Sequence, residues 1–185
     1  MAKDKISSTE KKLGREVKKI NRYADRATDI LSQLSQSADE LKLPSDLNIE
    51  DWFKELKKLK KKSKKLKPLV KKIGAYLSLI SESLPYRIQA REESEAFKAE
   101  PLKLARELDK SVNRITDLVE KNERARSYAS TESLVNVIDE VTKLFKQTTK
   151  WSYGALARYR GEKQKAKAFS ERLALERKAR KERSR

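Results

Sequence analysis

The chain has 185 residues, of which 40% are charged and 37% hydrophobic, and its formal net charge at pH 7 is +18. It has no cysteine and no histidine, which excludes disulfides, thiol nucleophiles, ordinary zinc sites and the commonest general base. Four glycines and four prolines are too few for the many turns of a β-sandwich or an α/β protein, so we expect an all-α protein.

The first predicted helix begins at a cap formed by Ser7 or Ser8 and ends before Pro44. Its apolar residues recur at alternating steps of 3 and 4, which is the spacing of one helix face. This first seam consists of Leu13, Val17, Ile20, Ala24, Ala27, Leu31, Leu34, Ala38 and Leu41. A seam held over four heptads predicts a long helix that packs lengthwise against others.

The second predicted helix starts near Ile49 and contains the sequence KKLKKKSKKLK at residues 57–67. The interruptions of this lysine run fall on a second seam of the same spacing, so the run is interpreted as structured helix with its lysines on the remaining faces. Because Pro68 lies inside the pattern, we expect a kink or short break near Lys67. The second seam consists of Ile49, Trp52, Leu56, Leu59, Ser63, Leu66, Val70, Ile73, Leu77, Ile80 and Leu84.

Two further helices are predicted after Pro85. The third runs from about Arg87 to Tyr128 with a kink near Pro101, or forms two helices that meet there at an elbow. Its inward residues are Ala90, Phe97, Leu104, Leu108, Val112, Ile115 and Val119. The fourth helix starts at residues 130–132, and its inward residues are Leu134, Ile138, Val141, Phe145, Thr148, Ser152, Ala155 and Tyr159.

Short connections between long helices predict an elongated antiparallel four-helix bundle with up-down-up-down topology. We expect a flexible N-terminus over residues 1–7, a single bundle domain over 8–176 and a frayed or disordered basic C-terminal tail over 177–185. The pattern also permits a domain-swapped dimer. No signal peptide or membrane span is evident, so we expect a cytoplasmic protein, or one associated with a nucleoprotein or virion if it is virus-encoded.

The positive charge is concentrated in two zones. Residues 46–85 hold 11 basic and 5 acidic groups, and residues 131–185 hold 15 and 7, whereas residues 86–130 hold 10 and 9. The sequence KWSYGALARYR at 150–160 mixes cations with aromatic rings, as single-stranded nucleic-acid sites do, although Trp151 and Tyr159 also fit core positions. The candidate nucleic-acid-binding residues are Lys57, Lys58, Lys60, Lys61, Lys62, Lys64, Lys65, Lys67, Lys150, Tyr153, Arg158, Arg160, Arg177, Arg180 and Arg183.

No catalytic motif is found. The four glycines are isolated, so the sequence has no phosphate-binding loop, and a di-iron bundle site would need histidine. We therefore expect a protein that is not an enzyme and that has no catalytic residue, metal site or cofactor.

The charge distribution favours a structural protein that binds DNA or RNA through the phosphate backbone, packages or coats it, and assembles as a homo-oligomer on it. One alternative is a peripheral protein that binds an anionic membrane surface through the lysine-rich helix, and another is an adaptor for an acidic protein partner. The lysines could also serve solubility only. The sequence does not distinguish DNA from RNA or single strands from duplexes.

Overall fold

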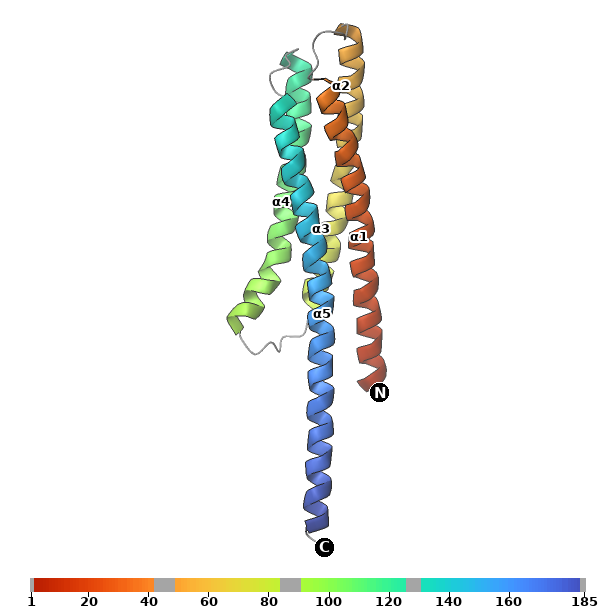
Figure 1. Ribbon diagram of the computed structural model, residues 1–185, viewed down its shortest axis with the longest axis vertical. Helices are drawn as coiled ribbons and strands as arrows, with labels where there is room; N and C mark the ends of the chain where they lie inside the picture. The colour runs from red at the N-terminus through yellow and green to blue at the C-terminus, as the bar shows by residue number, and fades with distance from the viewer. Residues whose placement is uncertain (1, 42–48, 84–90, 126–130, 184–185) are drawn as a thin grey trace.

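The computed structural model describes residues 2–41, 49–83, 91–125 and 131–183, and all of these except Leu41, Lys64 and Lys65 are helical. The predicted all-α class is therefore confirmed over the described part of the chain. The helices are α1 (Ala2–Glu40), α2 (Ile49–Ser63), α3 (Leu66–Ser83), α4 (Arg91–Ala125) and α5 (Thr131–Arg183). Figure 1 shows them extended along the long axis of the molecule, with α5 reaching well beyond the others.

Two helices start where the sequence analysis predicts, and the helices at the two ends of the chain extend further than predicted. α2 starts at Ile49 and α5 at Thr131, as predicted. α1 starts at Ala2, so the predicted cap at Ser7 or Ser8 is wrong, and α5 continues through the predicted tail to Arg183. The C-terminal segment RKARKER at 177–183 is rich in Lys, Arg, Ala and Glu, whose high helix propensity sustains a helix without a seam. Pro44 and Pro85 lie outside the described residues.

The two prolines inside the predicted helices have different surroundings. Residues 64–65 form a turn between α2 and α3, in which the Lys65 N–H donates to the carbonyl of Lys62 at 3.0 Å. Pro68 is thus in the first turn of α3, where its missing N–H removes no helical hydrogen bond. Pro101 instead lies inside α4, which is one helix over its whole length, so the two-helix alternative is wrong. Figure 1 shows the N-terminal part of α4 leaning away from the other helices.

The helices pack around one apolar interior. α1 and α4 each pack against α3 and α5, and α2 packs mainly against α4 and α1. The described parts of α1 and α4 do not pack directly against each other. Successive α2 and α3 therefore lie on one side of the interior and α5 on the other.

The predicted seams form this interior. All nine residues of the first seam are buried, and the second seam is buried from Trp52 to Ile80. The seams of α4 and α5 are buried from Leu104 to Val119 and from Leu134 to Ala155, with Tyr159 partly buried. The side chains of Ile49, Leu84, Ala90 and Phe97 lie outside the described residues.

Three small polar residues in the seams bond to their own helices. The hydroxyls of Ser63, Thr148 and Ser152 are buried and donate to the carbonyls of Lys60, Leu144 and Thr149 at 2.9, 2.8 and 2.8 Å. Each hydroxyl is satisfied within its own turn, so no neighbouring helix has to supply an acceptor.

The buried Phe145 provides a test of the interior. We expect Phe145→Ala to lower the free energy of unfolding by roughly 3–5 kcal/mol, because it leaves a cavity where a fully buried ring was. The exposed Tyr153 of the same helix is the control, and Tyr153→Ala should change stability by about 0.5 kcal/mol or less. Urea unfolding followed by circular dichroism measures both, and equal losses would contradict the described burial.

Candidate nucleic-acid interface

The lysine-rich segment lies on α2 and the start of α3, with its leucines turned into the interior. Five of the predicted lysines are exposed and form no ion pair with any described carboxylate, namely Lys57, Lys61, Lys64, Lys65 and Lys67. The first turn of α2 is acidic and its last turn basic, which matches the helix dipole and stabilises α2 itself. The dipole needs only one or two cations, so it explains few of these lysines.

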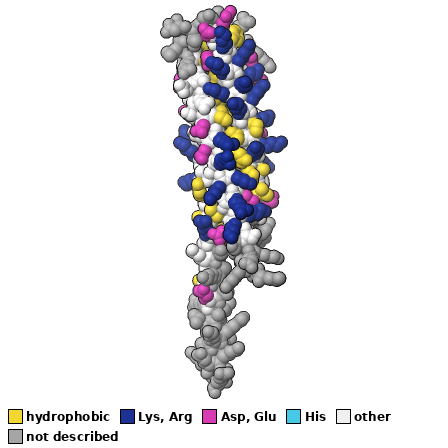
Figure 2. Space-filling view, turned by 90° about the vertical axis from the view of Figure 1, so that its right-hand side faces the viewer, with side chains coloured by type: hydrophobic (Ala, Val, Ile, Leu, Met, Phe, Trp, Pro, Cys, Tyr) yellow, Lys and Arg dark blue, Asp and Glu magenta, His cyan; other side chains and the backbone are white. Residues whose placement is uncertain are grey.

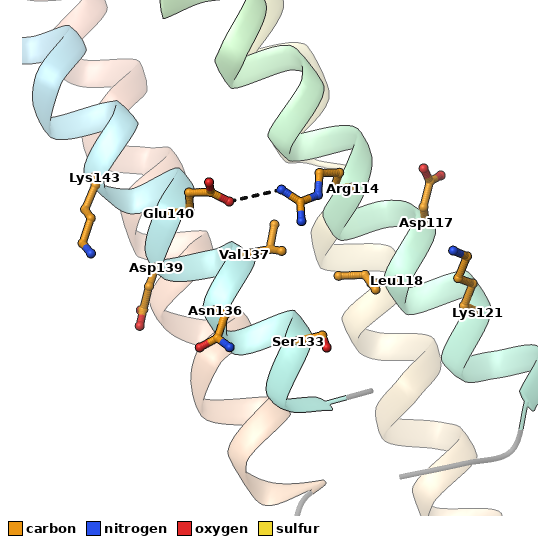
Figure 3. A pocket seen from close by; sticks show the side chains of 10 residues that line it. All are labelled: Arg114, Asp117, Leu118, Lys121, Ser133, Asn136, Val137, Asp139, Glu140 and Lys143. Atoms are coloured by element: carbon orange, nitrogen blue, oxygen red, sulfur yellow. Dashed lines mark hydrogen bonds and ion pairs between the residues drawn. The ribbon is translucent and has the colours of Figure 1, made fainter. Parts of the chain in front are cut away.

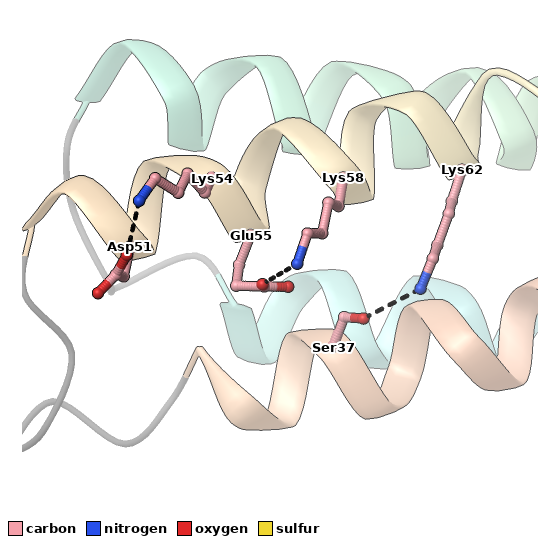
Figure 4. A network of polar contacts seen from close by, with 6 residues as sticks. All are labelled: Ser37, Asp51, Lys54, Glu55, Lys58 and Lys62. Carbon is pink, nitrogen blue, oxygen red and sulfur yellow. Dashed lines mark hydrogen bonds and ion pairs between the residues drawn. The ribbon is translucent and has the colours of Figure 1, made fainter.

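The other three predicted lysines of this segment have partners. The ammonium of Lys60 lies 2.6 Å from Glu123 Oε2 and 3.8 Å from Glu120 Oε1 of α4, and its hydrogen bond is the main cause that lowers the pKa of Glu123. Lys58 pairs with Glu55, and Lys62 reaches Ser37 of α1 at 3.5 Å (Figure 4). Lys60 is therefore largely neutralised by α4 and is a weak candidate for binding a polyanion.

The predicted residues of α5 lie elsewhere on the molecule. Lys150, Tyr153, Arg158 and Arg160 are exposed, and Arg160 Nε lies 3.2 Å from Glu10 Oε1 near the start of α1. Trp151 is buried, so it serves the core. The side chains of Arg177, Arg180 and Arg183 lie outside the described residues.

The structure does not bring the two predicted zones together. Lys62 lies beside Ser37 and Arg160 beside Glu10, and these two partners are 27 positions, about 40 Å, apart along α1. α5 also lies across the interior from α2 and α3. A short ligand that contacts Lys62 would therefore not reach Arg160.

The groove between α4 and α5 has balanced charge. It has a volume of about 800 Å³ and carries three cations and three carboxylates, namely Arg114, Lys121, Lys143, Asp117, Asp139 and Glu140. Arg114 and Glu140 are joined across it at 3.3 Å (Figure 3). Such a surface has no net attraction for a polyanion, in contrast to the side formed by α1, α2 and α3.

A tyrosine pair that the sequence analysis missed lies where α1 meets α3. The rings of Tyr23 and Tyr76 stack with centroids 6.1 Å apart and an interplanar angle of 19°. Lys19 Nζ lies 5.1 Å from the centroid of Tyr76, and Lys72 Nζ lies 5.3 Å from that of Tyr23. A sequence signal did exist, because each helix carries a Lys four residues before its Tyr, which places the two on one face.

The tyrosine pair lies within a longer line of positive charge. Each lysine covers a ring of the opposite helix, so the heptad lines that contain Lys19 and Lys72 border the same junction. Ser63 and Leu66, on either side of the turn between α2 and α3, are both buried, so the two helices turn the same face to the interior. The heptad line that contains Lys72 therefore continues from α2 into α3. We call this surface the basic strip, and it consists of Lys12, Lys19 and Arg26 of α1, Lys58, Lys65 and Lys72 of α2 and α3, and the half-buried Tyr23 and Tyr76.

Figure 2 shows the side of the molecule to which α1 and α2 belong. Dark blue Lys and Arg side chains cover much of the coloured part of this side, with yellow hydrophobic side chains between them and fewer magenta carboxylates. The surplus charge is therefore spread over an extended face and is not confined to the lysine-rich segment.

A buried carboxyl group underlies the α1 side of the strip. Glu16 is buried, and its Oε2 has no hydrogen-bond partner among the described residues. Burial raises the pKa of Glu16, and the nearby charges of Lys12 and Lys19 lower it to a smaller extent. Glu16 therefore offsets the charge of these two lysines less than an exposed glutamate would.

Comparison with protein-family models, curated proteins and solved structures found no match for this chain. No helix within the described ranges is long and apolar enough to cross a membrane. The same ranges contain no cluster of three or more Asp or Glu residues that could hold a metal ion.

The pairing of Lys60 can be tested through Glu123. We expect Lys60→Gln to raise the pKa of Glu123 toward its usual value of 4.5, and Lys61→Gln to leave it unchanged. Because the pKa of Glu123 is lowered in the folded state, the pair stabilises the fold above pH 4.5, and this contribution is lost as the pH falls through the folded-state pKa. Carboxyl-carbon NMR titration measures the shift, and identical Glu123 titration curves in both variants would disprove the pairing.

Glu16 leads to the opposite pH dependence. Its pKa is raised above 4.5 by folding, so its contribution to stability is full below pH 4.5 and is lost as the pH rises through the folded-state pKa. We expect Glu16→Gln to remove this loss, so that the variant gains stability over the wild type as the pH rises from 4.5 to 7. Urea unfolding at a series of pH values tests this, with the exposed Asp25→Asn of the same helix as control.

Proposed function

We propose that the protein is a non-enzymatic structural protein that binds the phosphate backbone of nucleic acid without sequence specificity. The observation that supports this most directly is the set of exposed lysines on α2 and α3 that form no ion pair with a described carboxylate, next to the basic strip. Lysine is a compact charge on a flexible stem, and it contacts phosphates without reading bases.

The cost of such a surface favours a polyanionic partner. Like charges held on one face repel one another and destabilise the folded chain. The α4–α5 groove shows that this chain also builds a helix junction with balanced charge. Solubility is served equally well by such mixed charges, so the one-sided surplus is better explained by a ligand that neutralises it.

The proposed role is packaging or coating of DNA or RNA. In this proposal the chain is an elongated antiparallel four-helix bundle with up-down-up-down topology, in which α2 and α3 form one rod and α5 extends as a basic tail. Several copies would bind along one strand as a homo-oligomer, each neutralising a run of phosphates. The tail arginines Arg177, Arg180 and Arg183 would then contact nucleic acid beyond the bundle.

An anionic membrane would be attracted by the same charges, but insertion needs a continuous apolar face. The exposed large hydrophobic residues of the described side chains are Leu79, Leu102 and Tyr153, which lie on three different helices. A salt titration of binding to single-stranded RNA, duplex DNA and anionic liposomes separates the two partners. Stronger binding to liposomes than to either nucleic acid would overturn the proposal.

The surface itself is tested by two variants that remove equal charge. The first replaces Lys57, Lys61, Lys64 and Lys65 by Gln, and the control replaces the exposed Lys103, Arg106, Lys110 and Lys121 of α4 by Gln. We expect the first variant to lose affinity at least roughly tenfold on every sequence and to reduce the slope of log K against log[salt] by up to about 3.

The control variant should retain most of the affinity and the slope. Equal losses in both variants would show that only net charge matters, and unchanged binding in the first would remove α2 from the interface. Circular dichroism confirms that both variants remain helical, as expected because Lys and Gln have similar helix propensity.

A further inference from the structure

The tyrosine pair of the basic strip has an arrangement that packing does not require. Its two rings stack on each other, and the ammonium groups of Lys19 and Lys72 cover a ring of the opposite helix. Both tyrosines are half-buried beside the core, while both lysines are exposed. The aromatic rings are therefore packed against the core, and the groups that cover them are charged and exposed to solvent.

We propose that the basic strip binds single-stranded nucleic acid, with bases stacking on Tyr23 and Tyr76 and the adjacent phosphates contacting Lys19 and Lys72. This inference rests on the proposed function and makes it more specific. It names the strand state of the ligand, which the net charge does not determine.

The covering lysines allow an exchange when a strand binds. A base that reaches a tyrosine ring displaces the ammonium from it, and the displaced ammonium pairs with a phosphate of the same nucleotide. The two cation–π contacts are replaced by two base stacks and two charge-assisted contacts. The aromatic positions and the charged positions are in this way used together, as they are in known single-strand sites.

The geometry selects a single strand over a duplex. In a duplex the bases are stacked on one another, and their faces cannot reach a protein ring without being flipped out. The cations of each line recur every seven residues, about 10.5 Å along a helix axis, which a flexible strand can follow by adjusting its backbone. The phosphates of a duplex would still contact the lysines, but the tyrosines would contribute nothing.

The decisive experiment compares a 12-nucleotide single strand with the duplex of the same sequence at fixed salt. We expect the double variant Tyr23→Leu with Tyr76→Leu to bind the single strand at least about tenfold more weakly, and to bind the duplex within about twofold of the wild type. The variant Tyr23→Phe with Tyr76→Phe keeps both rings and should keep the single-strand affinity. Leu102→Ala, at an exposed apolar side chain of α4 outside the proposed interface, is the control and should change neither.

The lysines give an independent readout. Lys19→Gln with Lys72→Gln should lower the salt slope for the single strand by about 0.7 for each lysine, whereas the tyrosine variants should leave the slope unchanged.

The outcomes separate the two proposals. Suppose that the wild type binds both nucleic acids. If the leucine variant then loses the same affinity for the single strand and the duplex, or keeps its affinity for both, base stacking on the strip is disproved and the proposed function stands. A loss of single-strand affinity in the phenylalanine variant also disproves it, because the rings are retained. If the wild type binds neither nucleic acid, both proposals are wrong.

Discussion

The structure depends on burying apolar side chains that recur at alternating steps of three and four. This spacing gives each helix one narrow apolar face, and the helices remove these faces from water by packing around a common interior. With 40% of its residues charged, the chain has few apolar groups to spare, and most of the large apolar side chains that the structure describes are buried in the interior or packed against it. The charged residues are in consequence confined to the outer faces, where their distribution decides what the protein attracts.

That outer distribution is uneven because only some lysines meet a carboxylate from a neighbouring helix. α4 supplies Glu120 and Glu123 to Lys60, and α4 and α5 balance each other across their groove. At the junction of α1 with α2 and α3, Glu55 pairs with Lys58, and the buried acid Glu16 has a raised pKa, so it offsets the nearby lysines less than an exposed glutamate would. The groove between α4 and α5 is therefore nearly neutral, whereas the side formed by α1, α2 and α3 is strongly basic.

The interior could be predicted from the sequence, because helix periodicity is a local property. Every described member of the first two seams is buried, including Ser63, which no hydrophobicity scale would place there. The site was predicted less well, because partners come from distant residues. Nothing near Lys60 in the sequence indicates that Glu123 neutralises it, and the contact between Tyr23 and Tyr76 depends on which helices are neighbours. The buried positions of Glu16 and Asn122 are likewise set by tertiary packing.

The self-satisfied hydroxyls of Ser63, Thr148 and Ser152 have a consequence for how the helices are aligned lengthwise. Because no hydrogen bond crosses the interior from these groups, they do not distinguish the observed alignment from one shifted by a heptad, about 10.5 Å. Bulky side chains such as Phe145 resist sliding by shape. Polar discrimination comes from the surface pairs Lys60–Glu123 and Arg160–Glu10, which lie toward opposite ends of the molecule. Arg114–Glu140 between α4 and α5 and the two lysine–tyrosine contacts between α1 and α3 add to this discrimination. The lengthwise alignment is thus fixed by surface contacts and steric fit, with no contribution from these three hydroxyls.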